Sequence, residues 1–126
     1  MVISIDHGNR QVKTVHKAFV SGLMESSVRP ALGEEYILYN NRYFSLTEHR
    51  LAYRRDKSKD ESFFLLSLFG IAYEMLAAGA YSAGQTTSVD LLIGLPPAHF
   101  GAQYHDFEAY FKRGVVKFQL GNKPFS

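Results

Sequence analysis

The first half of the chain alternates apolar and polar positions over short runs, which is typical of β-strands. The pattern predicts one strand over residues 2–6 and a second over residues 11–20, with a tight turn at residues 7–10. The next segment, residues 21–33, holds Ser, Gly and Pro, so it predicts an irregular connection with room for one short strand.

Two further strand-like runs follow at residues 36–39 and 42–46, and both are rich in aromatic residues. Asn40 and Asn41 separate the two runs. Asparagine tolerates the positive φ that a two-residue hairpin turn requires. The pattern therefore predicts a β-hairpin.

The longest apolar segment of the chain predicts a buried helix. Its apolar residues between 63 and 76 would cover most of the helix circumference, so the helix should pack on more than one side. Ser58 and Glu61 fit a capping box at its start, and Gly79 is placed to end it after about Ala78. Interruptions of the apolar run argue against a membrane span. These interruptions are Ser67, Gly70, Tyr73 and Glu74.

A loop over residues 82–88 leads to a near-continuous apolar run over residues 89–93. Such a run is typical of a central strand that is covered on both faces. We expect this strand in the same sheet as residues 2–6 and beside them. Gly94 and the two prolines that follow break the run.

Residues 98–113 predict a second helix, because four aromatic residues recur at helical spacing on one face. These residues are Phe100, Tyr104, Phe107 and Phe111. Gly114 can end this helix. Residues 116–120 then alternate like a strand, residues 121–122 suit a turn, and a last strand begins.

The composition is that of one soluble globular domain, with 126 residues of which 46% are apolar. The formal charge of +2 is too small to indicate nucleic-acid binding, and the mixed signs of residues 53–61 favour a solvated connection over a basic patch. The absence of cysteine excludes disulfides and thiolate metal sites. Because no signal-peptide pattern is present, we expect a cytoplasmic protein without membrane contact.

The hairpin at the start of the chain carries the candidate chemistry. Its first strand ends at Asp6, Gly8 follows in the turn, and the returning strand carries Lys13. Turn amides can point at an anion, Gly8 lets the backbone approach closely, and Lys13 supplies a point charge for phosphate oxygens. Asp6 would repel a phosphate but can hold magnesium through water. A plain surface hairpin with an aspartate in its turn fits the same pattern.

Two other residues of this hairpin are open to more than one interpretation. Asn9 could donate its amide to a phosphate or only favour the turn. His7 fits an exposed turn histidine better than a phosphate contact. No zinc-ligand spacing and no Walker, Rossmann or serine-hydrolase motif occurs elsewhere in the chain.

The stretch "IDHGNRQVKT" resembles the first phosphate loop of the actin-like ATPases, D-x-G-x-x-x-x-K, with Asp6, Gly8 and Lys13 in the matching places. Sugar kinases and the Hsp70 ATPase domain share that motif. The order of elements and the run "IGLPP" resemble, more narrowly, the amino-terminal domain of the bacterial plasmid-segregation actins of the ParM and Alp type.

This resemblance implies an α/β fold, the RNase-H-like half-domain of the actin superfamily. It would have a mixed five-strand-type sheet, two main helices and a small β insertion around residues 30–50 that also uses residues 115–126. The resemblance further implies ATP or ADP with Mg²⁺ as ligands. Gly8, Asn9 and Lys13 would bind the nucleotide phosphates, and Asp6 would hold magnesium through water.

The resemblance also sets expectations for the whole protein. Residues 1–126 would be one domain, a fragment of a longer two-domain chain, with no catalytic residue of its own and no ATPase activity in isolation. The parent protein would be a filament-forming ATPase that segregates plasmid DNA through an adaptor protein, without touching DNA itself. The alternatives are half of a sugar- or acetate-kinase-like phosphotransferase and a non-catalytic interaction domain; for the kinase, "ESSVRPALGEEY" is a poor sugar-binding loop.

Overall fold

The computed structural model describes residues 1–8, 11–30, 35–47, 61–94, 114–121 and 123–126. The predicted second helix over residues 98–113 and the capping residue Ser58 lie outside these ranges. The described elements follow in chain order: β1 (Val2–His7), β2 (Gln11–Lys13), β3 (Ala18–Val20), β4 (Leu23–Ser26), β5 (Ile37–Tyr39), β6 (Arg42–Leu46), α1 (Glu61–Ala77), β7 (Asp90–Gly94), β8 (Phe118–Leu120) and β9 (Lys123–Phe125).

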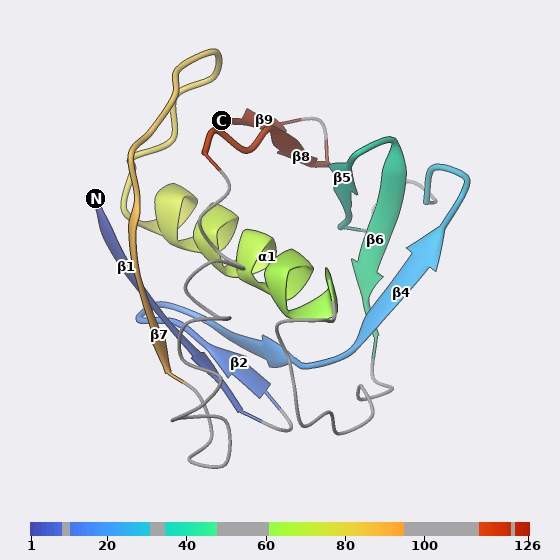
Figure 1. Cartoon of the computed structure of the whole chain (residues 1–126), viewed down its shortest axis with the longest axis horizontal. Helices are drawn as coiled ribbons and strands as arrows, with labels where there is room; N and C mark the ends of the chain where they lie inside the picture. The colour runs from blue at the N-terminus through green and yellow to red at the C-terminus, as the bar shows by residue number, and fades with distance from the viewer. Residues whose placement is uncertain (9–10, 31–34, 48–60, 95–113, 122) are drawn as a thin grey trace.

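The strands form two sheets, and α1 lies between them (Figure 1). The first sheet has the order β3-β2-β1-β7, in which β7 runs parallel to β1 and the other pairs are antiparallel. The second sheet has the order β4-β6-β5-β8-β9 and is antiparallel throughout. The mixed sheet of the described residues therefore has four strands rather than five, and the smaller β-rich part is a separate five-stranded sheet.

The C-terminal strands join a hairpin that lies far away in the sequence. Ile37 pairs with Leu120 and Leu38 with Gln119, so β5 and β8 are neighbours. In the same sheet, Asn40 and Asn41 have φ angles of 51° and 62° between β5 and β6. Both values are positive, as the sequence-based expectation of a two-residue hairpin turn requires.

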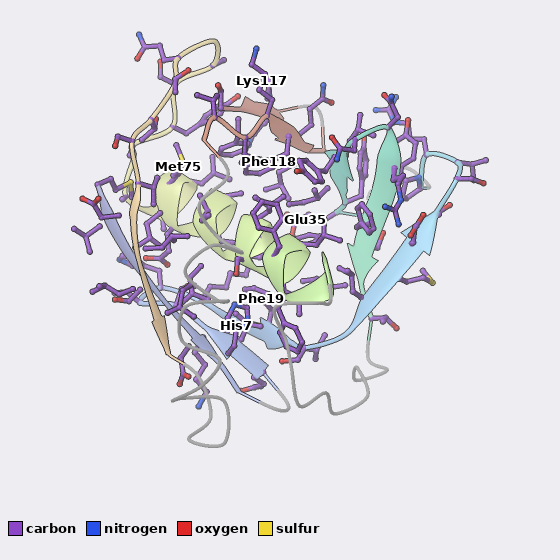
Figure 2. All side chains as sticks on the ribbon, viewed as in Figure 1. His7, Phe19, Glu35, Met75, Lys117 and Phe118 are labelled. Atoms are coloured by element: carbon purple, nitrogen blue, oxygen red, sulfur yellow. The ribbon has the colours of Figure 1, made fainter. Side chains whose placement is uncertain are left out.

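Helix α1 packs on both sheets, as its nearly continuous apolar pattern predicts. Figure 2 shows His7 and Phe19 on the side of α1 that faces the first sheet, and Phe118 on the side of the second sheet. The helix ends at Ala77, and Gly79, whose φ is 67°, follows it, while the amide of Ala80 donates to the carbonyl of Met75 at 2.8 Å. This is the glycine C-cap that the sequence predicts.

The prediction of one continuous strand over residues 11–20 is wrong. The chain turns back after Lys13, so that β2 and β3 form an antiparallel hairpin of their own. The amide of Thr14 donates to the carbonyl of Lys17 at 2.7 Å and closes this turn. The β-branched residues of the stretch favour a strand locally, but hydrogen bonds from the turn to α1 override that preference.

The expected place of β7 beside β1 is confirmed, since Ile3 pairs with Leu91 and Ile5 with Ile93. The expectation that β7 is covered on both faces is wrong, because Leu92 is 59% exposed. In the described part of the chain, β7 is an edge strand and α1 covers one face of its sheet. Leu92 points to the other face.

None of the helices in the described ranges is long and apolar enough to span a bilayer.

Candidate functional site

Strand β1 separates the candidate hairpin into two faces. Every second residue, Ile3, Ile5 and His7, is buried against α1, while Asp6 is exposed on the opposite face. This alternation follows from the pleat of a strand. The expectation that His7 is an exposed turn histidine is therefore wrong, and so is its placement at a phosphate: its ring is 1% exposed and lies 2.7 Å from the hydroxyl of Ser67.

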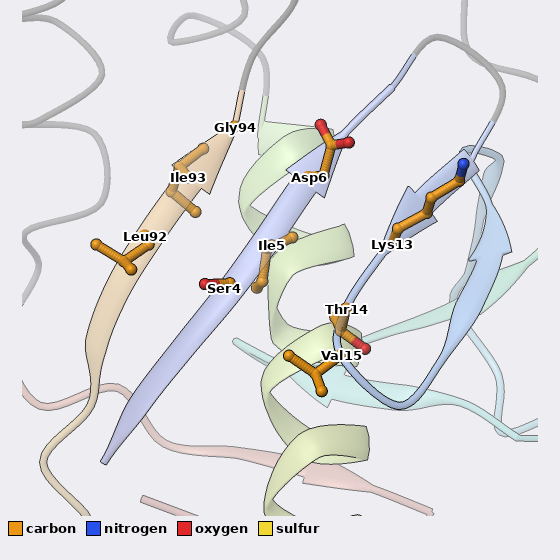
Figure 3. Close-up of a pocket in the computed structure, with 9 residues that line it drawn as sticks. All are labelled: Ser4, Ile5, Asp6, Lys13, Thr14, Val15, Leu92, Ile93 and Gly94. Carbon is orange, nitrogen blue, oxygen red and sulfur yellow. The ribbon is translucent and has the colours of Figure 1, made fainter.

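Asp6 and Lys13 lie opposite each other in the pairing of β1 with β2. Both side chains therefore stand on the same face of the sheet, and both line an open hollow of about 530 Å³ whose wall includes Gly94 (Figure 3). Figure 3 shows the carboxylate and the ammonium at the end of the strands where the hairpin turns. Among the residues that the structure describes, no ion pair joins Asp6 to Lys13. The acid and the lysine are thus brought together without neutralising each other directly.

The structure shows why a glycine stands at position 8, and the sequence pattern predicts this reason only in part. Its amide donates to the carbonyl of Gln11 at 3.0 Å, and a Cβ on Gly8 would lie 3.0 Å from that same oxygen. The amide of Gly8 is thus engaged within the turn. Gly8 permits a close backbone approach, and any amide donors for an anion would have to come from neighbouring residues. Asn9 lies outside the described residues.

Replacing Gly8 by alanine is expected to displace the hairpin tip and to cost about 1–2 kcal/mol of unfolding free energy, because the new methyl group would be too close to a backbone oxygen. Urea unfolding together with amide chemical shifts of Asp6 and Gln11 would measure both effects. Gly84→Ala serves as a strain control, since Gly84 has φ +80° but open space around it. Unchanged shifts at Asp6 and Gln11 in Gly8→Ala would contradict the prediction.

Gly94 lines the hollow, although the sequence pattern predicts only that it breaks a strand. A Cβ on Gly94 would lie 3.1 Å from Oδ1 of Asp6. The missing side chain therefore leaves room for the Asp6 carboxylate in its present position. Only the parallel pairing of Asp6 with Gly94 reveals this contact, since the two residues are far apart in sequence.

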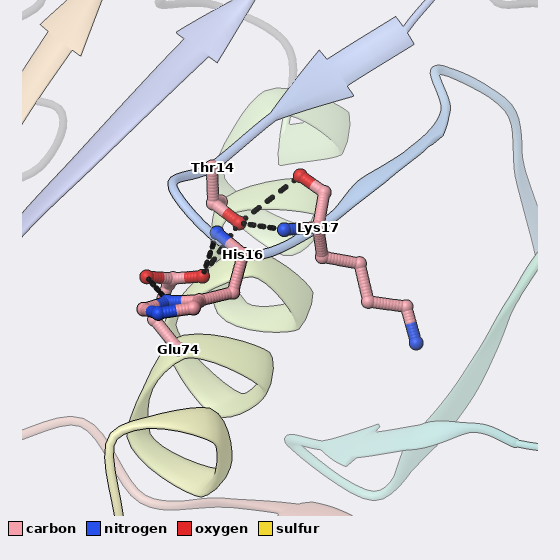
Figure 4. A network of polar contacts seen from close by, with 4 residues as sticks. All are labelled: Thr14, His16, Lys17 and Glu74. Carbon is pink, nitrogen blue, oxygen red and sulfur yellow. Dashed lines mark hydrogen bonds and ion pairs between the residues drawn. The ribbon is translucent and has the colours of Figure 1, made fainter.

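The turn after Lys13 is held by a buried carboxylate of α1 (Figure 4). Glu74 accepts hydrogen bonds from the hydroxyl of Thr14 at 2.8 Å, the amide of His16 at 2.9 Å and Nδ1 of His16 at 2.9 Å. Burial alone would raise the pKa of the Glu74 carboxyl, but the hydrogen bonds from His16 and Thr14 outweigh it and lower the pKa below its ordinary value. Glu74 is therefore ionised in the folded protein at neutral pH.

A second contact ties the same turn to the other sheet. Nζ of Lys17 lies 4.2 Å from the ring centre of Tyr73, and the hydroxyl of Tyr73 donates to Glu35, just before β5. Burial and the Glu35 carboxylate both raise the pKa of Tyr73, so its hydroxyl stays protonated. Sequence reasoning missed the roles of Tyr73 and Glu74. The available signal was their position as polar groups within an apolar helix.

Metal ligation at the hollow rests on Asp6 alone among the described residues. These residues contain no cluster of three His, Asp or Glu side chains that could hold a metal ion directly. The exposed Asp6 carboxylate suits an ion that keeps most of its water, as magnesium does.

The comparisons with known proteins bear on the fold. No family model and no curated protein matches the sequence. Among solved structures, the crystal structure of the apo ParM protein of psk41 matches with a TM-score of 0.72 and 15% sequence identity, over 99% of this chain and 46% of that one. The chain therefore has a ParM-like α/β fold, which confirms the resemblance at the level of the fold, and it spans less than half the length of that ParM chain.

Proposed function

We propose that this chain is the nucleotide-binding amino-terminal half of an actin-like, filament-forming ATPase that segregates plasmid DNA. One observation carries the proposal: in a ParM-like fold, Asp6 and Lys13 share one face and one hollow at the end of the first hairpin. In this interpretation the first sheet belongs to the RNase-H-like half-domain of the actin superfamily. Self-association into filaments, an adaptor protein on the plasmid and a cytoplasmic location are parts of the same proposal.

The two charged side chains suit different parts of a magnesium-bound nucleotide. The Lys13 ammonium is a compact cation that attracts phosphate oxygens. Asp6 repels those oxygens, but a hydrated Mg²⁺ between the carboxylate and the phosphates would reverse the sign of the interaction. Gly8 would let the backbone of the loop come close to the phosphates, and Asn9 would complete the loop around them.

Phosphoryl transfer needs more than this hairpin, because it depends on positioning and on excluding water around the transferred group. The hollow is open, and Asp6 is the one carboxylate among the described residues that line it. We therefore assign ATPase activity to the full-length protein and only nucleotide binding to this chain.

Titration of the 126-residue chain with ADP tests the proposal. We expect binding in the millimolar range, because a few exposed contacts contribute only about 1 kcal/mol each. Magnesium should strengthen the binding. Asp6→Asn should remove this enhancement while metal-free binding persists, and Lys13→Ala should weaken binding with or without magnesium. Amide chemical shifts report both the affinity and the place of binding.

Two matched variants serve as controls for charge. Asp90→Asn removes an exposed carboxylate from the same face of the sheet at the far end of β7, and Lys123→Ala removes an exposed lysine from the second sheet. Both should bind magnesium and ADP as the unmodified chain does. Shift changes that cluster away from residues 6–13, or an unaltered affinity in Lys13→Ala, would refute the proposal.

A further inference from the structure

Helix α1 interrupts its apolar surface at three positions that face the same part of the first sheet. Ser67, Gly70 and Glu74 are spaced by three and four residues, so they lie on one face of the helix. All three are buried, and all three face the β1–β2 hairpin. We refer to Ser67, Gly70 and Glu74 as the hairpin-facing stripe.

The first member of the stripe holds the end of β1. The hydroxyl of Ser67 donates its proton to the carbonyl of Phe63 at 2.9 Å, so it accepts from Nε2 of His7 at 2.7 Å. His7 is the residue next to Asp6 in the strand. Because consecutive side chains of a strand point to opposite faces, the buried side chain of His7 places Asp6 on the other face, at the hollow.

The last member of the stripe holds the start of the turn after β2. Glu74 accepts hydrogen bonds from the hydroxyl of Thr14 and from the backbone amide and Nδ1 of His16. Thr14 follows Lys13 directly and lines the same hollow. The carboxylate therefore fixes the backbone from which Lys13 projects.

The middle member lets the helix come close to both strands. A Cβ on Gly70 would lie 3.2 Å from Cδ1 of Ile5 and 3.3 Å from Cγ2 of Thr14. A glycine within a helix destabilises it relative to alanine. Buried polar groups also stabilise a core less than well-packed apolar ones of similar size. The hairpin-facing stripe therefore lowers the stability of the core and, in return, fixes the position of the hairpin.

We propose that the hairpin-facing stripe positions the phosphate-binding hairpin, with Ser67 acting through His7 on Asp6, and Glu74 acting through Thr14 on Lys13. This inference rests on the proposed nucleotide-binding function. We refer to Asp6 with its support as the Asp6 arm of the site, and to Lys13 with its support as the Lys13 arm. The inference assigns each arm to a different residue of α1. None of the three is among the described residues that line the hollow, so they are positioning residues. Rigid support of this kind is what holds charged groups in a productive geometry.

The two arms predict two different binding defects. Ser67→Ala should reduce the magnesium enhancement of ADP binding about fivefold and leave metal-free binding nearly unchanged, because it loosens the Asp6 arm. Glu74→Gln should weaken ADP binding about fivefold both with and without magnesium, because it loosens the Lys13 arm. Each factor corresponds to the loss of roughly one net hydrogen bond. General destabilisation would not divide the effects in this way.

Hydrogen exchange supplies a readout that needs no ligand. The amides of Gly8 and Thr14 donate within the two turns. Exchange at Gly8 should accelerate about fivefold in Ser67→Ala, and exchange at Thr14 should accelerate similarly in Glu74→Gln. The control variants are Ser45→Ala, which alters another buried serine, and Glu25→Gln, which alters a glutamate paired with Arg42; both lie in the second sheet.

The outcomes separate this inference from the proposed function. If the unmodified chain binds no ADP with magnesium, the proposed function fails and so does the role of the stripe in nucleotide binding. If the chain binds but Ser67→Ala and Glu74→Gln match the two controls in affinity and in exchange, the stripe is not a positioning device and the proposed function stands. Equal losses in both variants, with and without magnesium, would also overturn the assignment of one residue to each arm.

Discussion

Replacing Phe69 by alanine is expected to cost about 3–5 kcal/mol of unfolding free energy, a large share of the stability of a domain of this size. Phe69 is 0% exposed at the centre of α1. Its ring lies 6.4 Å from that of Phe19 and 6.1 Å from that of Tyr73. The truncation would open a cavity where α1 packs on β3, and a tightly packed interior closes such a cavity only in part.

Urea unfolding followed by circular dichroism measures this loss. Leu92→Ala is the matched control, because Leu92 is 59% exposed and its truncation should change the free energy of unfolding by less than about 0.5 kcal/mol. Equal effects of the two substitutions would show that α1 does not form the centre of the core.

Replacing Glu74 by alanine is expected to cost roughly 2 kcal/mol at neutral pH, because it removes the acceptor of the backbone amide and Nδ1 of His16. The hydroxyl of Thr14 also loses Glu74 but keeps the carbonyl of Lys17 as an acceptor at 3.1 Å. The side chain of Glu74 is only 7% exposed, so water can replace the carboxylate only in part. The same contacts lower the pKa of Glu74 in the folded state relative to the unfolded chain.

The lowered pKa makes this stabilisation depend on pH in a defined direction. The contribution of the Glu74 charge is fully present above the ordinary pKa of a glutamate, 4.5, and is lost as the pH falls through the lower pKa of the folded state. Urea unfolding of the unmodified chain and of Glu74→Gln between pH 7 and pH 3 should therefore give free energies that converge toward the acid end. A difference between them that stays constant, or that grows on acidification, would contradict the assignment.

The local pattern of the sequence was enough for the parts of the fold that depend on neighbouring residues. Short-range sterics and hydrogen bonding produce the alternation over β1, the positive φ of Asn40 and Asn41, and the glycine cap of α1 at Gly79. The spacing of Asp6 and Lys13 likewise places both on one face once the hairpin forms, because strand pairing has a period of two.

The errors occurred where a distant residue decides the outcome. Thr14 and Val15 favour a strand by their own propensity. Glu74, about 60 residues later, accepts hydrogen bonds from this segment and stabilises a turn, which divides the predicted strand into β2 and β3. Likewise, the hydrogen bond to Ser67 turns the ring of His7 into the core, although a histidine beside a glycine is more often exposed.

The sequence by itself determined the local elements, the glycines at their ends and the presence of an acid and a lysine on one hairpin, because each depends on chain stereochemistry within a few residues. Only the tertiary structure decided which face of β1 carries Asp6, how closely Gly94 approaches that carboxylate, and which residues of α1 hold the hairpin. Those features depend on contacts between segments up to about 90 residues apart, and no local pattern encodes which segments meet.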